Sequence, residues 1–231
     1  MISHRPTICS ILSALVILAA CSAFEPSPPA RVVRVKALAD VPFRNRNPGW
    51  DQEARGLIEA ASDYYEREFG IRLVTQNVAA WPENERVPST PTLLARLLKQ
   101  FPVTSADSSY DIVVAFSGEN VSRILSDGRP RVDRIGNCSQ GLARYVVLPT
   151  RKLFRYTGQT TELDSDVLAL VHEVGHVFGA EHVDDFNSIM HENFDYRSEF
   201  DSKNRKIIQN NRCISRQNRH ICSHYSRRFR T

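Results

Sequence analysis

The chain has 231 residues, of which 42% are hydrophobic and 24% are charged, and its formal net charge at pH 7 is +4. A chain of this length suits one domain of ordinary size that buries a real core. The composition excludes an intrinsically disordered chain and a protein embedded in a membrane, because both classes depart strongly from these proportions.

The first twenty residues differ from the rest of the chain. A short polar start that includes Arg5 precedes the apolar run Ile8–Ala20, and this run is too short to cross a bilayer at about 1.5 Å per helical residue. This order of segments predicts a cleaved signal peptide over residues 1–20. The following residues 21–30 are rich in proline and serine, which predicts a tether to a folded domain over residues 31–212.

The end of the signal segment, Leu18-Ala19-Ala20-Cys21, resembles the lipobox of bacterial lipoproteins. The resemblance implies that Cys21 is diacylated, becomes the new N-terminus and attaches the protein to a membrane. We therefore expect a lipoprotein of the bacterial cell envelope that faces the periplasm or the cell exterior. The alternative is an ordinary secretory signal that is cut beside small residues and leaves Cys21 as a free thiol.

The first half of the domain combines strand and helix patterns. Valines that partly alternate with basic residues predict a strand over Arg31–Leu38, and apolar residues at three- and four-residue intervals predict a helix over Asp51–Phe69. Gly70 is a stop signal for that helix. A second strand is predicted over Ile71–Val78, and prolines mark a loop over Pro88–Pro91.

The second half of the domain continues this pattern. We expect a short amphipathic helix over Thr92–Phe101, a buried strand over Asp111–Phe116, a loop over Gly118–Arg134, a strand over Leu142–Leu148 and a helix over Ser165–Phe178. Either Asp164 or Ser165 is expected to cap the last of these helices. Strands and helices alternate, so the predicted fold class is α/β (α+β).

Two histidines four residues apart, His172 and His176, lie in the helix predicted over Ser165–Phe178. They project from one face about one turn apart, so both imidazoles can reach one ion. Gly179 suits the end of this helix, and a turn there brings His182 back as a third ligand. Three neutral imidazoles that leave a fourth position open predict a catalytic Zn²⁺ site.

Glu173 points to a different angle of this helix, so it is not an expected ligand. Its carboxylate can hydrogen-bond the water in the open position and accept a proton from it. A zinc ion would lower the pKa of that water and polarise a scissile carbonyl group. We therefore predict hydrolysis with Glu173 as the general base.

The string HExGHxxGxxH, from His172 to His182, resembles the motif of the metzincin clan of zinc peptidases. Metzincins also have a methionine turn beneath the zinc, and Asn187–Met190 supplies one here. An ordinary core methionine is the alternative, but Met190 is the only methionine besides Met1, which favours the Met-turn. The resemblance implies a catalytic domain with a small mixed twisted sheet, a long active-site helix and a Met-turn. It also implies a zinc metalloendopeptidase that acts on protein or peptide substrates.

Within the clan the chain looks like the matrixins. Met190 lies eight residues after His182, the spacing typical of matrixins, and Phe200–Asn211 resembles their final helix behind the active site. Two positions depart from the pattern. Glu192 stands where matrixins usually have proline. Val183 follows the third histidine, at a position where each family of the clan has its own characteristic residue, and valine is none of these. Because of Glu192 we expect a pocket wall of different shape with an added negative charge, and because of Val183 we assign no subfamily beyond a likeness to matrixins.

The same resemblance suggests substrate-binding residues. Gly141, Leu142 and Ala143 occupy the place of the matrixin edge strand whose backbone pairs with an extended substrate, although a plain strand is the alternative. Phe194 occupies the place of an aromatic residue in the wall of the pocket that takes the side chain after the scissile bond. It implies a preference for apolar side chains there.

The last part of the chain is basic. From residue 202 onward there are nine Lys and Arg residues and no Asp or Glu, and we treat residues 213–231 as a basic tail. Such a stretch is a solvated surface, or it attracts anionic lipid head groups or an acidic substrate. Once Cys21 is acylated, three cysteines remain, namely Cys138, Cys213 and Cys222, which indicates one disulfide of open pairing and one free thiol.

Two alternatives to an endopeptidase remain. One is a non-catalytic, lipid-anchored binding protein on a metallopeptidase scaffold, and the other is an exopeptidase or a hydrolase of a non-protein amide. Nucleic acid is not an expected partner of an exported protein, and we expect a monomer. Asp184 and Asp185 suit either calcium binding or an ordinary solvated loop.

Overall fold

A computed structural model describes residues 31–85, 90–102, 109–118, 144–150, 153–158, 164–192 and 199–212. Among the helices of these ranges, none combines the length and the apolar character needed to span a bilayer. Several predicted features lie outside the described residues and stay predictions: the signal peptide, Cys21, the tether, residues 119–134 of the predicted loop, Cys138, Gly141, Leu142, Ala143, Phe194, Cys213, Cys222 and the basic tail.

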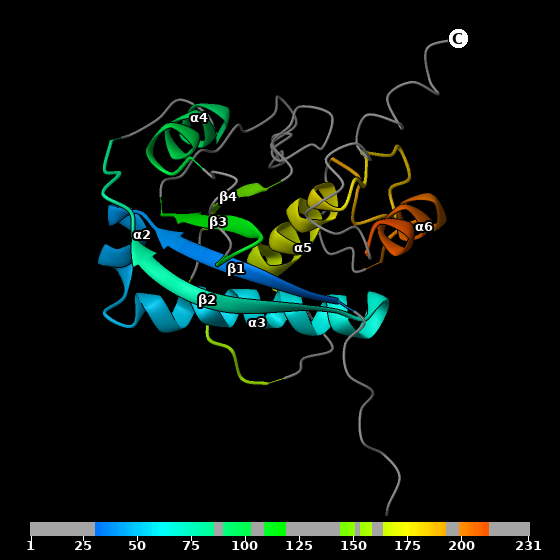
Figure 1. Cartoon of the computed structure of the whole chain (residues 1–231), viewed down its shortest axis with the longest axis horizontal. Coiled ribbons are helices and arrows are strands. Elements are labelled where there is room, and N and C mark those ends of the chain that lie inside the picture. Colours follow the sequence, from blue (N-terminus) through cyan, green and yellow to red (C-terminus); the bar gives the residue numbers. More distant parts are fainter. Residues whose placement is uncertain are drawn as a thin grey trace, which may run out of the picture.

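The described residues form four strands and five helices (Figure 1). In chain order they are β1 (Arg31–Ala39), α2 (Val41–Arg46), α3 (Trp50–Phe69), β2 (Ile71–Ala80), α4 (Thr90–Gln100), β3 (Ile112–Ser117), β4 (Tyr145–Pro149), α5 (Ser165–Val177) and α6 (Ser202–Asn211).

The strands form one sheet in the order β2-β1-β3-β4, and each neighbouring pair runs parallel. The α/β class is confirmed, but the mixed sheet that we expected is replaced by an all-parallel one among the described strands. The reason lies in the connections, because parallel strands need a crossover that returns the chain to the starting end. Helices α2 and α3 separate β1 from β2, and α4 separates β2 from β3.

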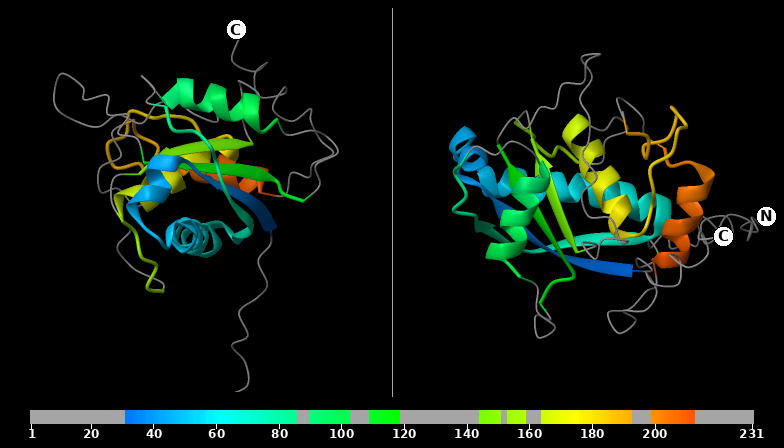
Figure 2. Two further views of the ribbon diagram at one scale, coloured as in Figure 1. Left: turned by 90° about the vertical axis from the view of Figure 1, so that its left-hand side faces the viewer. Right: turned by 90° about the horizontal axis from the view of Figure 1, so that it is seen from above.

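Helices cover both faces of the sheet, with α3 below it and α4 above it in the left view of Figure 2. The sequence of β3 explains this arrangement, because successive strand side chains point to opposite faces. Ile112, Val114 and Phe116 pack in the large core with α3 and α5. Val113 and Ala115 pack in a smaller core with α4. A strand buried on both faces is expected to be apolar, as β3 is from Ile112 to Phe116.

The ends of several elements follow from single residues. Gly70 takes a left-handed conformation with φ 67° at the end of α3, as its place in the sequence predicted. Asp164 rather than Ser165 caps α5, since its side chain accepts a hydrogen bond from the backbone N–H of Asp166. The sequence analysis missed α2, whose signals were Asp40 as the N-cap and a proline in the first turn.

Helix α3 supports the helix that carries the two histidines. The Tyr65 hydroxyl donates a hydrogen bond to the backbone carbonyl of Val171 in α5 at 2.7 Å. The ring of Tyr65 also lies 5.9 Å from Phe178 and 6.3 Å from Phe200, measured between ring centroids, a usual separation for aromatic pairs. One buried tyrosine of α3 therefore contacts α5, its C-cap and the residues just before α6.

Candidate metal centre

Helix α5 holds the first two histidines of the motif in a buried position. His172 is fully buried and His176 is 3% exposed. The distance between the Nε2 atoms of the two rings is 3.1 Å. The four-residue spacing thus places both rings one turn apart on the buried side of one helix.

The chain turns sharply after α5 and brings the third histidine back. Gly179 has φ +88°, a left-handed conformation that a glycine adopts without steric cost. The backbone N–H of Ala180 donates to the carbonyl of Gly175 at 2.9 Å, which closes the turn. As a result, the Nε2 atom of His182 lies 3.1 Å from that of His172 and 3.2 Å from that of His176.

The backbone sets the protonation of two rings. The Nδ1 atom of His172 lies 2.6 Å from the carbonyl oxygen of Ile189, and that of His176 lies 2.7 Å from the carbonyl oxygen of Ala180. A carbonyl only accepts, so each Nδ1 carries the hydrogen, and in the neutral form of either ring Nε2 then presents a lone pair. Burial lowers the pKa of His172 well below its ordinary value, and His176 acts in the same direction, so the ring is neutral at neutral pH.

These three nitrogens fit a zinc ion. Two nitrogens bound at about 2.0–2.1 Å to one tetrahedral zinc lie about 3.3 Å apart, close to the observed separations of 3.1 to 3.2 Å. Neutral imidazoles whose lone pairs converge repel one another unless a cation lies between them. Within the described residues, these histidines are the one group of His, Cys, Asp or Glu side chains that could hold a metal ion.

The third histidine contacts a carboxylate that the sequence analysis assigned to a pocket wall. An oxygen of Glu192 lies 3.5 Å from the Nδ1 atom of His182. A carboxylate beside the outer nitrogen of a metal-binding histidine orients the ring and raises its basicity. The charge at position 192 was visible in the sequence, but nothing in the spacing indicated that it would face His182.

Glu173 lies in α5 between the two histidines and is 1% exposed. Its negative charge reaches the neighbouring helix α3. Burial raises the pKa of the Tyr65 hydroxyl well above its ordinary value, and Tyr64 and Glu173 act in the same direction. Tyr65 therefore stays protonated and can donate its hydrogen bond to α5.

Met190 is fully buried and lies against α5. A Cβ atom added to Gly175 would lie 3.0 Å from the Met190 sulfur and 3.1 Å from the Phe200 ring, so only a glycine leaves room for this contact. The backbone N–H of Val183 donates to the carbonyl of Met190 at 3.2 Å. The methionine thus packs beneath the helix residue that directly precedes His176.

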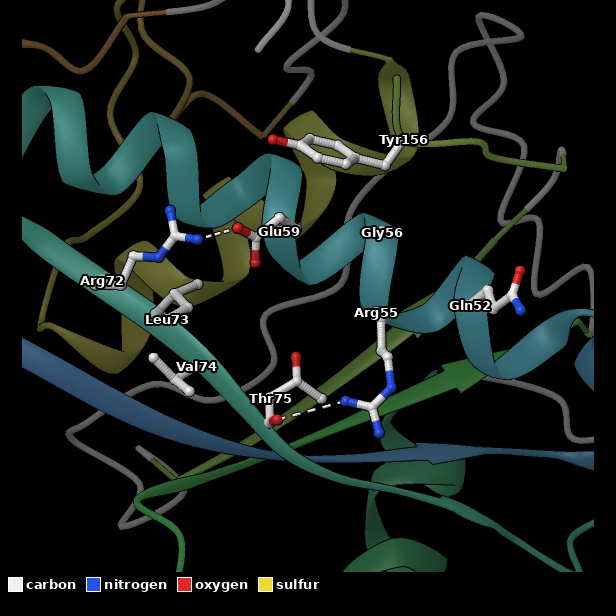
Figure 3. A pocket seen from close by; sticks show the side chains of 9 residues that line it. All are labelled: Gln52, Arg55, Gly56, Glu59, Arg72, Leu73, Val74, Thr75 and Tyr156. Carbon is white, nitrogen blue, oxygen red and sulfur yellow. Dashed lines mark hydrogen bonds and ion pairs between the residues drawn. The ribbon is translucent and has the colours of Figure 1, made fainter. Parts of the chain in front are cut away.

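A separate pocket of about 430 Å³ lies between α3 and β2. Figure 3 shows that Arg72 reaches toward Glu59 and that Arg55 reaches toward the backbone of Thr75. The ring of Tyr156 stands at its rim. None of the three histidines lines this pocket, so it is not part of the metal centre.

A search of curated proteins finds no match. Among solved structures, the archaemetzincin of Methanopyrus kandleri is similar, with 18% sequence identity and a TM-score of 0.47, over 82% of this chain and 98% of that chain. A family model described as metallo-peptidase family M12, of the reprolysin type, matches residues 29–226. Because the match spans most of the chain, the chain belongs to metallo-peptidase family M12.

Proposed function

We propose that the protein is a zinc-dependent endopeptidase in which His172, His176 and His182 bind the metal and Glu173 is the general base. The observation that carries the proposal is the convergence of three imidazole nitrogens within 3.2 Å of one another. Three protein ligands leave one position of a tetrahedral zinc open, as in catalytic rather than structural sites. Membership of a metallopeptidase family supports peptide bonds as the substrate.

The metal, when bound, would polarise the scissile carbonyl and make an attacking water more acidic. Glu173 follows His172 directly, so its side chain leaves α5 about 100° around the helix axis from that ligand. A carboxylate held there accepts one proton as the water oxygen attacks the carbonyl carbon. The same carboxyl group then gives that proton to the leaving nitrogen as the carbon–nitrogen bond breaks.

The finer features of the substrate site rest on the resemblance to matrixins. That resemblance supports Gly141, Leu142 and Ala143 as backbone partners of an extended peptide, and Phe194 as an apolar wall for the side chain after the cleaved bond. An edge that pairs with backbone on both sides of the cleaved bond favours an endopeptidase over an enzyme that trims chain ends. The likeness to matrixins stays a prediction.

Quenched fluorescent peptides with acetylated and amidated ends test the proposed activity. We expect internal cleavage that a zinc chelator reduces by at least about 10²-fold and that added zinc restores. Cleavage that resists the chelator would argue against the metal mechanism. Cleavage restricted to peptides with a free end would instead indicate an exopeptidase.

The proposal extends to a membrane anchor at Cys21 in a bacterial cell envelope. It is supported by the lipobox-like residues 18–21, which end the apolar signal segment. Metabolic labelling with a fatty-acid probe should mark the wild-type protein and the Cys138→Ser control, but not Cys21→Ser. Absence of label on the wild-type protein would show that Cys21 is not an anchor.

A further inference from the structure

The third ligand lacks the support that α5 gives to the other two. His182 lies after the turn at Gly179, on a segment that is neither helix nor strand. Its ring must nevertheless stay within 3.2 Å of two buried nitrogens. Loop segments hold a fixed geometry only where other elements bind their backbone.

Helix α6 supplies that support through Asn204, which is fully buried. The side-chain oxygen of Asn204 accepts a hydrogen bond from the backbone N–H of Glu181 at 2.8 Å. The side-chain nitrogen donates one to the carbonyl of the same residue, also at 2.8 Å. Because an amide offers both a donor and an acceptor, it can hold both polar groups of one backbone residue. That residue directly precedes His182.

Two more polar residues of the same region hold the ends of this segment. The carboxylate of Asp201, the N-cap of α6, accepts from the Ser188 hydroxyl at 2.8 Å. Burial opposes ionisation of Asp201, but hydrogen bonds from Asn204 and Ser188 outweigh it and lower the pKa. At the other end of α6, the side chain of Asn211 donates to the carbonyl of Phe178 at 2.7 Å.

The spacing of these contacts follows the period of a helix. Residues 201, 204, 208 and 211 recur at three- and four-residue intervals, so they share one face of α6. Three of them bind the segment 178–188, and Ile208 is fully buried between them. Figure 1 shows α6 beside α5 and the segment that follows it.

We propose that this face of α6 is a clamp for the third metal ligand, with Asn204 as the positioning residue that holds the backbone before His182. The clamp rests on the proposed zinc site but not on the reaction. Without it, the metal would have to order a loose loop when it binds, and that ordering would weaken binding. Some residues do not bind the metal themselves but hold its ligands in place. Replacing such a residue typically lowers the metal affinity by about 10- to 100-fold.

The zinc affinity of the folded, metal-free protein, measured by chelator competition, tests the clamp. Asn204→Ala should weaken zinc binding by at least about 10-fold. Ile207→Val is the matched control, because Ile207 is a buried residue of α6 outside the four clamp positions, so the change loosens the packing of α6 but leaves every clamp hydrogen bond intact. If the two variants bind zinc equally well, Asn204 has only a structural role and the clamp is rejected.

A second pair of variants covers the case in which Asn204→Ala does not fold. Asn211→Ala removes the bond to Phe178, whereas Asn210→Ala removes an exposed asparagine one position earlier. We expect weaker zinc binding and an altered visible spectrum of the Co²⁺-substituted protein only for Asn211→Ala. Identical spectra and affinities for the pair would overturn the clamp. If the wild-type protein binds zinc but cleaves no peptide, the proposed function is wrong. The comparison of zinc binding between Asn211→Ala and Asn210→Ala would still test the clamp in that case.

Discussion

Glu173→Gln is expected to lower kcat for peptide hydrolysis by about 10²- to 10⁴-fold, the usual contribution of a general base, while zinc stays bound. Glutamine has the shape of glutamate but cannot take up a proton. The residue is 1% exposed between two of the proposed ligands, so an isosteric replacement should leave their packing intact. The measurement is kcat on a cleaved peptide together with the zinc content of the same sample.

The matched control is Asp184→Asn, which removes the charge of an exposed carboxylate two residues after His182. It should keep nearly the full kcat, because general field effects at an exposed site are weak. A Glu173→Gln variant that retains its activity would reject Glu173 as the base. Loss of zinc from that variant would show instead that Glu173 supports the metal.

His182→Ala is expected to weaken zinc binding by about 10²-fold or more. Zinc binding with four ligands is worth roughly 10–16 kcal/mol, so one ligand accounts for roughly 3 kcal/mol, and about 1.4 kcal/mol corresponds to a tenfold change. His182 lies on a loop beyond α5, so the metal-free fold should keep most of its stability. Chelator competition measures the affinity, and urea unfolding of the metal-free protein measures the stability.

A second histidine of the same region provides the control for that substitution. His191 stacks on Phe186 with ring centroids 4.4 Å apart and is not in the three-histidine group. His191→Phe keeps an aromatic ring for the stack and should bind zinc as the wild type does. If His182→Ala and His191→Phe lose the same zinc affinity, His182 acts through the structure of the loop and is not a ligand.

The parts of the metal centre that follow from local periodicity could be predicted from the sequence. Two histidines at a four-residue interval share a helix face, and a glycine three residues on ends that helix. The structure brings His172, His176 and His182 together accordingly. The same reasoning predicted α5 within one residue of its observed end at Val177.

Features that depend on distant contacts could not be predicted in this way. Asn204 binds the backbone of a residue 23 positions away, and no local pattern encodes that partner. The parallel direction of the strands depends on how helices cross between them. Helix α2, with six residues, is too short for an apolar period to appear, so its capping residue and its first-turn proline were the only signals.

X-ray absorption at the zinc edge of the metal-loaded protein tests the metal site most directly. The three-histidine site predicts one zinc per chain with three nitrogen neighbours of imidazole type at about 2.0–2.1 Å and no sulfur. The same spectrum of His182→Ala should show one imidazole fewer. A sulfur neighbour at about 2.3 Å, or fewer than three imidazoles in the wild-type protein, would contradict the site.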